Sequence, residues 1–173
     1  VSAIRTATMN TGINSAALSG NWSGYASIAP AGSTFTAIVG NWTVPAVTGS
    51  PTSDTYSCTW IGIDGYNSST VEQIGTESNY VGGVATYYPW VEYYPDPQTD
   101  LSADFTVNAG DSMSAEITYQ GVVTGAPGTA NLGDYSLLLT LIDNTDAANP
   151  NYKGPYDGVN YTYYSVTAPD LSS

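Results

Sequence analysis

Side chains that alternate in character at every second residue are the feature that most restricts how this chain can fold. Six segments show this period and are rich in β-branched and aromatic residues: residues 34–45, 56–63, 87–94, 111–119, 135–143 and 159–167. The pattern is typical of β-strands, because successive side chains of a strand point to opposite faces. No ten-residue segment shows the 3.6-residue apolar period of a helix. Many short strands without helices predict an all-β sandwich or barrel.

Clusters of glycine, proline and aspartate separate these segments and predict turns between strands. The clusters are GSPTSD (49–54), VGG (81–83), PDPQTD (95–100), NAGD (108–111) and GAPG (125–128). Residues 144–158 are polar and predict a long loop. The length of 173 residues suits one domain, and the first residues are small and polar. We therefore expect an N-terminal arm over 1–19, flexible or lying at a sheet edge, and one β-sandwich over 20–173.

The chain is strongly acidic. It has fifteen acidic residues and only two basic ones, Arg5 and Lys153, so its formal net charge is −13. Because the chain has no cationic patch, binding to nucleic acid or to an anionic membrane is not expected. Carboxylates lose their charge near pH 4, so self-repulsion falls in acid. One interpretation is an acidic working environment; the other is a secreted protein with a soluble, acidic surface.

The chain contains no histidine and a single cysteine, Cys58. The lack of histidine excludes Ser-His and Cys-His nucleophile pairs and most zinc sites. Cys58 lies in the apolar segment SCTWIGI and is predicted to be a buried, small apolar side chain without a disulfide partner. No run of 18 apolar residues and no leader pattern is visible, so we expect neither a membrane span nor an uncleaved signal peptide.

Without histidine, carboxylates, amides and hydroxyls are the groups left for catalysis. Four acidic residues surround Gln73 in the sequence: Asp64, Glu72, Glu77 and Glu92. Glu72 and Gln73 are neighbours, so in an extended segment they point to opposite faces and do not both line one site. Taken singly, such residues are more often structural, since an acid after a strand commonly caps a turn and a lone glutamine usually lies on the surface.

Alternation groups aromatic residues with some of these carboxylates. Trp60 and Asp64 fall on one face of their strand. One face of the next long strand carries four residues of this kind: Tyr88, Trp90, Glu92 and Tyr94. If these two strands were adjacent, they would form an aromatic floor that carries carboxylates. Packing is nevertheless the commoner role of tryptophan and tyrosine in strands.

Three groups of motifs occur in order: NWSGY (21–25); TWIGIDG (59–65) with EQIGTE (72–77); and YYPWVEYYP (87–95) with NAGDSMSAEITYQG (108–121). In these motifs the chain resembles the glutamic peptidases, also called eqolisins or the G1 family, and it is most similar to their bacterial branch. The resemblance runs from about residue 20 to the end of the chain. It implies a concanavalin-like, jelly-roll sandwich of two bent antiparallel sheets. It also implies an acid-active endopeptidase. We expect the protein to be secreted and to use no cofactor and no metal in its site.

The resemblance further implies roles for single residues. Gln73 matches the catalytic glutamine, whose amide helps to hold a water molecule and donates a hydrogen bond to the oxyanion. A neutral amide keeps its charge state in acid, and a carboxylate base suits a pH near 3 where imidazole does not. Five residues match positions expected to shape the substrate cleft: Trp60, Asp64, Glu77, Trp90 and Glu92. Tyr88 and Pro89 depart from the family pattern, and Pro89 indicates a bulge or a sheet edge.

The second catalytic residue of the family, a glutamate that acts as general base, has no match in this chain. Glu116 in SAE (114–116) matches an earlier strand of the family and is rejected for this role. The glutamate is expected in polypeptide that follows Ser173. Either a second chain, cut from the same precursor near Ser173, carries it and stays bound, or the chain is an inactive fragment. The two-chain enzyme is favoured, because missing strands would leave apolar sheet edges exposed.

Two other functions are compatible with the same residues. A carbohydrate-binding or glycoside-hydrolysing sandwich would use the aromatic face for sugar stacking and paired acids such as Glu77 and Glu92 for hydrolysis. A structural or adhesive domain would have no catalytic site. The motif EQIGTE favours the peptidase, whose substrates would be polypeptides.

Overall fold

The structure is a computed structural model, and it describes residues 5–10, 14–66, 68–103, 106–122, 135–145 and 163–167. These residues form strands, turns and irregular segments, and no helix occurs among them. The described part of the chain accordingly holds no helix that could cross a membrane. Internal contacts divide the chain into two units, Val1–Phe35 and Thr36–Ser173, and each is described by itself.

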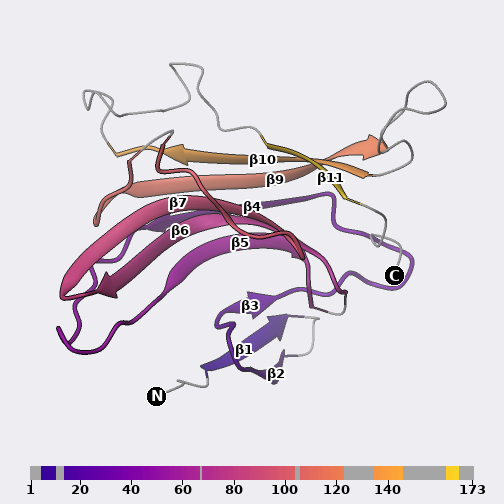
Figure 1. Cartoon of the computed structure of the whole chain (residues 1–173). Coiled ribbons are helices and arrows are strands. Elements are labelled where there is room, and N and C mark those ends of the chain that lie inside the picture. The colour runs from indigo at the N-terminus through magenta and orange to yellow at the C-terminus, as the bar shows by residue number, and fades with distance from the viewer. Residues whose placement is uncertain are drawn as a thin grey trace. The chain divides into compact units, whose positions relative to one another are not determined.

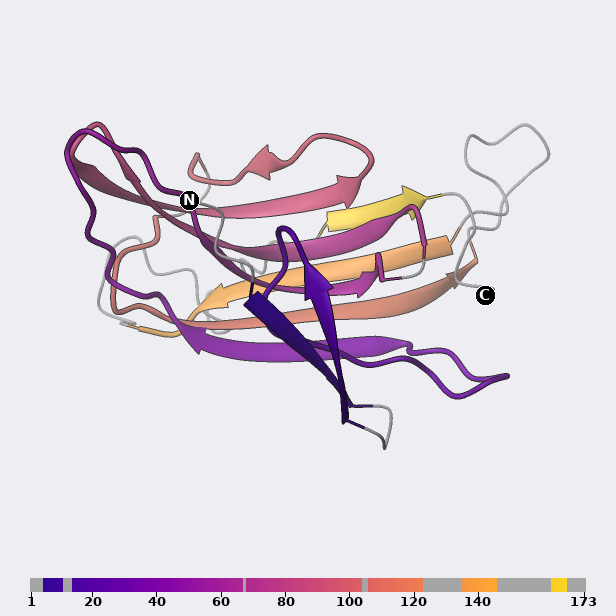
Figure 2. The ribbon, with the colours of Figure 1, turned by 90° about the horizontal axis from the view of Figure 1, so that it is seen from below.

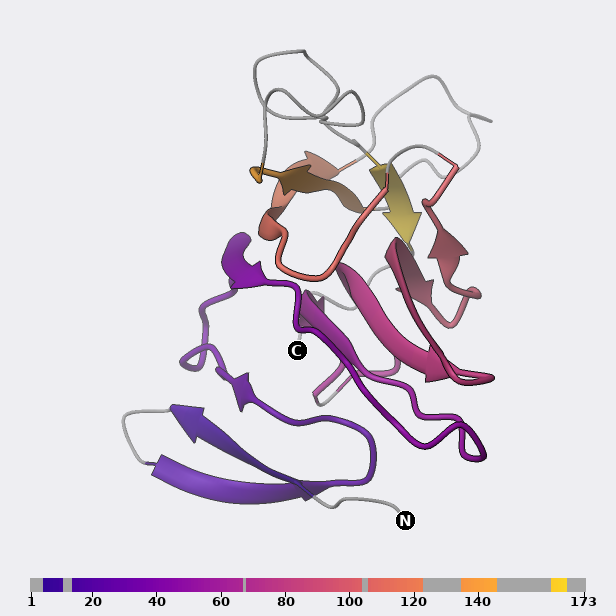
Figure 3. The ribbon, with the colours of Figure 1, turned by 90° about the vertical axis from the view of Figure 1, so that its left-hand side faces the viewer.

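The first unit holds a small three-stranded sheet. Strand β1 (Arg5–Asn10) pairs antiparallel with β2 (Asn14–Ser19), and β3 (Tyr25–Ala26) joins β1 in parallel (Figure 3). The described part of residues 1–19 is therefore a β-hairpin. The division into an arm over 1–19 and a domain from residue 20 stays a prediction.

The described residues of the second unit form two four-stranded antiparallel sheets (Figure 1). The first sheet has the order β11-β10-β9-β4, with β4 at Ala37–Thr43, β9 at Ser112–Val122, β10 at Tyr135–Asp143 and β11 at Tyr163–Thr167. The second has the order β5-β6-β7-β8, with β5 at Cys58–Asp64, β6 at Val71–Val81, β7 at Val84–Tyr94 and β8 at Thr99–Asp100. Figure 2 shows that their strands run in nearly the same direction, as in an aligned sandwich. The predicted all-β sandwich of antiparallel sheets is confirmed.

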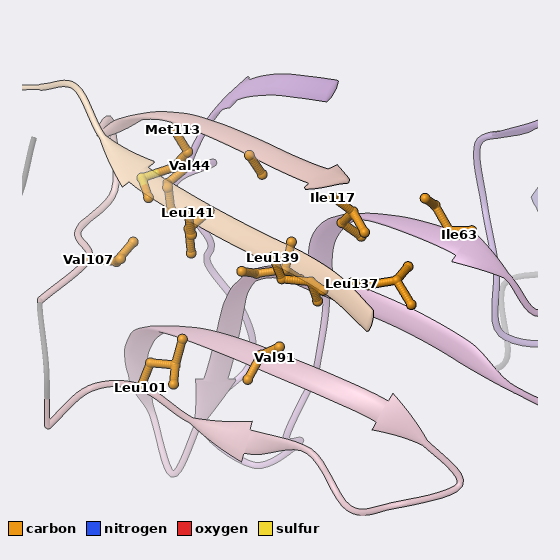
Figure 4. Packing of buried hydrophobic residues seen from close by; sticks show 12 residues of the cluster. Val44, Ile63, Val91, Leu101, Val107, Met113, Ile117, Leu137, Leu139 and Leu141 are labelled. Carbon is orange, nitrogen blue, oxygen red and sulfur yellow. The ribbon is translucent and has the colours of Figure 1, made fainter. Parts of the chain in front are cut away.

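The core of the sandwich lies between these two sheets (Figure 4). Its buried members come from both layers and from the segments that join them: Val44, Ile63, Ile74, Val91, Leu101, Val107, Met113, Ala115, Ile117, Leu137, Leu139 and Leu141. One polar contact also joins the layers, because the indole nitrogen of Trp42 in β4 donates to the hydroxyl of Thr76 in β6 at 2.9 Å. The apolar side chains that pack between the sheets therefore determine which face of each sheet is left outside.

Strand β6 is central in its sheet and was not among the strands predicted from periodicity. It pairs with β5 on one side and with β7 on the other. The β6–β7 hairpin turns at Gly82 and Gly83, whose φ angles are +58° and +85°. Two consecutive positive φ angles are typical of a type I′ turn, so the turn predicted at VGG (81–83) is confirmed. Of the other predicted loops, 125–128 and 146–158 lie outside the described residues.

Pro89 was predicted to mark a bulge or a sheet edge. The β6–β7 register runs without interruption past the Thr76↔Pro89 pair, so no bulge forms there. The carbonyl of Pro89 accepts a hydrogen bond from the Leu101 nitrogen at 2.9 Å, on the side away from β6. In an antiparallel strand the N–H and C=O of one residue point to the same side. The donor that proline lacks therefore falls on the side of the short strand β8, and the β6–β7 ladder loses no bond.

The prediction for Cys58 is wrong, because the structure places this residue in an exposed position. Cys58 begins β5 and pairs with Glu77, on the face that points away from the core. Although the residue is exposed, partial burial of its thiol and the charges of Glu77 and Glu92 raise the thiol pKa to about 11. The thiol therefore stays protonated in acid and at neutral pH.

Candidate active site

The residues that the sequence singled out lie on one face of strands β5, β6 and β7. Directly paired residues in antiparallel strands share a face. The row Ile61–Ile74–Val91 packs in or against the core cluster, so the neighbouring rows point away from the core. We call this surface the outer face and define it by four rows: Asp64–Val71–Tyr94, Gly62–Gln73–Glu92, Trp60–Gly75–Trp90 and Cys58–Glu77–Tyr88.

The face assignments made from alternation are confirmed by this register. Trp60 and Asp64 share the outer face, as do the four residues named on β7. Glu72 points to the opposite side from Gln73 and is only 2 % exposed. The expectation that the two aromatic strands could be neighbours is wrong, because β6 lies between them. That correction puts Gln73 between the two aromatic strands.

Gln73 makes a hydrogen bond to Glu92, its direct cross-strand partner on β7. The side-chain nitrogen Nε2 of Gln73 donates to Oε2 of Glu92. Gln73 is 8 % exposed, so this bond is shielded from most of the solvent. A shielded hydrogen bond to a charged group is stronger than one in water. The geometry therefore holds the carboxamide in a defined place at the centre of the outer face.

Two glycines stand beside Gln73 and Trp60 on the outer face. A Cβ at Gly62 would lie 2.9 Å from Cζ3 of Trp60 and 3.3 Å from Cβ of Gln73. A Cβ at Gly75 would lie 2.3 Å from the carbonyl oxygen of Thr59. Neither site has room for a side chain, and sequence reasoning did not assign a role to either glycine. Glycine inside a strand often marks a close approach of neighbouring groups, which is the signal that could have identified them.

Two tryptophans flank Gly75 in the same row. Trp60 is half-buried, and Trp90 is 3 % exposed. The indole nitrogen of Trp90 is buried and has no hydrogen-bond partner within the described part of the structure. A buried donor without an acceptor is uncommon in folded proteins. The row therefore combines two large apolar side chains with a buried indole donor.

Glu77 lies on β6 one row beyond the tryptophans. Partial burial raises the pKa of its carboxyl group, and hydrogen bonds from the side chains of Asn79 and Gln98 act in the opposite direction. Burial also raises the pKa of Tyr88, and the charges of Glu77 and Asp100 add to that effect. This end of the outer face thus combines acidic and phenolic groups.

Asp64 ends β5 at the other end of the outer face. Its φ angle is +69°, a conformation that aspartate tolerates better than most residues. The turn that follows is held by Ser68, whose hydroxyl accepts from the Gly65 nitrogen at 2.8 Å and donates to the Thr70 carbonyl at 3.0 Å. Asp64 therefore shares the outer face with Gln73 and also begins a turn.

The spacing of the acids restricts other chemistry. Glu77 and Gln73, the β6 partner of Glu92, are four positions apart along β6. In an extended strand this places the backbone positions of the Glu77 and Glu92 rows about 13 Å apart. Hydrolysis of glycosides uses carboxyl groups roughly 5 to 9.5 Å apart. Glu116, the acid that the sequence analysis rejected, lies on β9 in the other sheet and lines a depression of about 110 Å³ together with Val39 and Ile142. Within the described ranges no group of three or more potential ligands could hold a metal ion.

The chain is similar in sequence to a known family of peptidases and to two known proteins. The profile of the peptidase A4 family matches residues 20–133. Aspergillopepsin-2 from Aspergillus niger is 32 % identical over an alignment of 133 residues, which covers 66 % of this chain and 46 % of that protein. Scytalidopepsin B from Scytalidium lignicola is 31 % identical over 118 residues, which is 68 % of this chain and 42 % of that protein. The matched regions thus span less than half of each relative, and no solved structure matches the chain.

Proposed function

Because the chain belongs to the peptidase A4 family, we propose that it forms part of an acid-active glutamic endopeptidase in which Gln73 stabilises the oxyanion. The observation that carries this proposal is the place of Gln73, at the centre of the outer face between Gly62 and Glu92. Trp60 and Trp90 would form the apolar wall of the substrate cleft, while Asp64 and Glu77 would lie toward its two ends.

In the proposed reaction a glutamate removes a proton from a water molecule, and the water oxygen attacks the carbonyl carbon of the peptide bond. The second hydrogen on Nε2 of Gln73 donates to the oxyanion that forms, because the first is bonded to Glu92. The same glutamate then delivers its proton to the amide nitrogen, and the C–N bond breaks. A preorganised neutral donor performs this task at any pH at which the glutamate can act as a base.

We further infer that this glutamate comes from polypeptide that follows Ser173, on a second chain of the same precursor. The positions of the described acids support this inference. Glu92 is already bonded to Gln73, Glu77 stands two rows away, and Glu116 belongs to the other sheet. The greater length of both relatives is compatible with an additional segment.

Secretion into an acidic medium forms part of the same proposal. Fifteen acidic residues and only two basic ones give a surface whose self-repulsion falls as the pH approaches 4. The relation to the bacterial branch of the family stays a prediction, and the two relatives named above are both fungal.

Hydrolysis of an unfolded protein such as casein at pH 3, in the presence of pepstatin, tests the function. The native protein should cleave it, and Gln73→Ala and Gln73→Glu should lower kcat about a hundredfold or more, as for the loss of an oxyanion donor. Glu116→Gln is the matched control and should keep full activity, because Glu116 is exposed on the other sheet. Activity near that of the native protein in both Gln73 variants would remove this residue from the mechanism.

Native intact-mass analysis tests the second chain. We expect a complex whose mass exceeds that of the 173-residue chain and resolves into two polypeptides on denaturation. Full proteolytic activity from the 173-residue chain alone would show that the base lies within it.

A further inference from the structure

We propose that Glu92 is a positioning residue, which fixes the orientation of the Gln73 carboxamide so that Nε2 faces β7 and the amide oxygen faces Gly62. The inference rests on the proposed function, because it assigns Glu92 a task in that reaction. Its structural basis is the side-chain contact between Gln73 and Glu92, in which Nε2 is the donor.

The backbone register makes this contact possible. Gln73 and Glu92 are directly opposite each other on β6 and β7. Side chains at such positions begin about 5 Å apart, so a glutamine and a glutamate meet without leaving the sheet surface. On the other side of Gln73 the partner is Gly62, which has no side chain. Of the two residues directly opposite Gln73, only Glu92 therefore carries a side chain.

The chemistry of the two groups determines the direction of the bond. A carboxylate only accepts hydrogen bonds, whereas a carboxamide has donors on its nitrogen and acceptors on its oxygen. Opposite an ionised Glu92, turning the carboxamide by 180° would place its oxygen against a carboxylate oxygen with no hydrogen between them. In its ionised form Glu92 thus selects one of the two orientations of Gln73.

This orientation matters for the proposed reaction. With Nε2 bonded to Glu92, the amide oxygen is left to accept from the attacking water, and one hydrogen on Nε2 stays available for the oxyanion. Because Gln73 is 8 % exposed, few water molecules can replace Glu92 as the partner of its nitrogen. A carboxamide free to turn would present its oxygen to the oxyanion in part of the molecules, and repulsion would slow the reaction.

A double-mutant cycle separates positioning from direct substrate contact. In Glu92→Gln the new carboxamide can accept from or donate to Gln73, so both orientations become available. We expect kcat to fall about tenfold or more with KM changed less than about twofold, as for a group that acts through the oxyanion donor. In the Gln73→Ala background, Glu92→Gln should have no further effect, and Glu116→Gln should have none in either background.

Three kinetic results would overturn the proposal. Additive effects of Glu92→Gln and Gln73→Ala would show that Glu92 acts independently of Gln73. A higher KM with unchanged kcat would make Glu92 a substrate contact. A loss in Glu92→Gln larger than that in Gln73→Ala would make Glu92 the base, because a positioning residue cannot matter more than the group that it positions.

A spectroscopic measurement tests the orientation without any turnover. The two Nε2 protons of Gln73, assigned by their absence in Gln73→Ala, are distinct as in any carboxamide, and bonding to Glu92 should shift one of them downfield in a ¹⁵N–¹H spectrum. Their separation should therefore exceed that of an exposed glutamine; it should stay so in Glu116→Gln and fall to the exposed value in Glu92→Leu. A separation no larger than that of an exposed glutamine in the native protein would overturn the positioning role even if the enzyme is active. An enlarged separation in a protein that cleaves nothing would instead overturn the proposed function and support the orientation.

Discussion

At the scale of single residues, two glycines of the outer face are as important for its packing as the side chains around them. Because Gly62 and Gly75 have no side chains, Trp60, Gln73 and the Thr59 carbonyl can pack closely against them. The sequence analysis identified Gln73 through the motif EQIGTE. Glycine inside a strand is a signal that could have identified Gly62 and Gly75, but only the structure shows which atoms approach them across β5 and β6.

Replacing Gly75 by alanine should destabilise the sandwich. The added Cβ would lie 2.3 Å from the Thr59 carbonyl oxygen and 2.7 Å from Cβ of Trp60, and the first of these is a backbone atom that cannot move without separating β5 from β6. Overpacking of this kind costs about 1–3 kcal/mol. Urea denaturation followed by tryptophan fluorescence measures the loss.

Gly20→Ala is the matched control for this prediction. A Cβ at Gly20 would meet no atom within 4 Å, so that variant should unfold at the native urea concentration. An unchanged midpoint for Gly75→Ala would show that the strands accommodate the methyl group and would contradict the steric argument.

At the scale of elements, β6 is the strand on which the proposed site depends and also the one that periodicity missed. Its sequence VEQIGTESNYV contains glutamate, glutamine, glycine, serine and asparagine, most of which are depleted in strands. It is a strand because β5 and β7 pair with it on both sides. By contrast, β10 (Tyr135–Asp143) has the bounds that periodicity predicted, since its apolar side chains alternate regularly.

Removing the hydroxyl of Thr76 should weaken the contact between β6 and the opposite sheet. Thr76 is fully buried, and its hydroxyl accepts the indole hydrogen bond of Trp42. Thr76→Val keeps the shape of the side chain but leaves that indole without its partner, at a cost of about 1–3 kcal/mol. Chemical denaturation should detect this decrease in the free energy of unfolding.

Thr43→Val is a suitable comparison, because Thr43 is an exposed residue of β4. Its unfolding free energy should stay close to the native value. If Thr76→Val proves equally stable, the Trp42–Thr76 bond contributes nothing to the association of the two sheets.

At the scale of the whole molecule, buried carboxyl groups make the free energy of unfolding depend on pH. Asp111 and Asp143 are both buried, at 8 % and 5 % exposure, near the ends of β9 and β10. Burial raises the pKa of Asp111, and the charge of Asp143 adds to this. The pKa of Glu77 is raised as well, chiefly by burial. Together with a net charge of −13, these groups oppose folding when they are ionised.

The sign of the pH dependence follows from these shifts. A carboxyl whose folded pKa lies above its unfolded value of about 4 contributes its full stability below that value and loses it as the pH rises through the folded pKa. We therefore expect unfolding to require more urea at pH 3 than at pH 7. Asp111→Asn removes one charge and keeps an acceptor for the Asn108 nitrogen, which Asp111 binds at 2.6 Å. This variant should gain stability at pH 7 and change little at pH 3.

The exposed residue Asp96 provides the control, since Asp96→Asn removes a charge of the same kind without the burial. Its effect should be small at both pH values. Equal stabilisation of Asp111→Asn at pH 3 and pH 7 would show that the charge of Asp111 is not the cause.

The sequence by itself determined the fold class, the turn at residues 81–83, and that Trp60 shares a face with Asp64 and Trp90 with Glu92. These properties are local, because they depend on alternation along one strand and on glycine in tight turns. Only the tertiary structure decided that β6 lies between β5 and β7, that Cys58 is exposed and that Gln73 is bonded to Glu92. These properties depend on strand order and register, which bring together residues far apart in the chain and leave no mark on the pattern of any single segment.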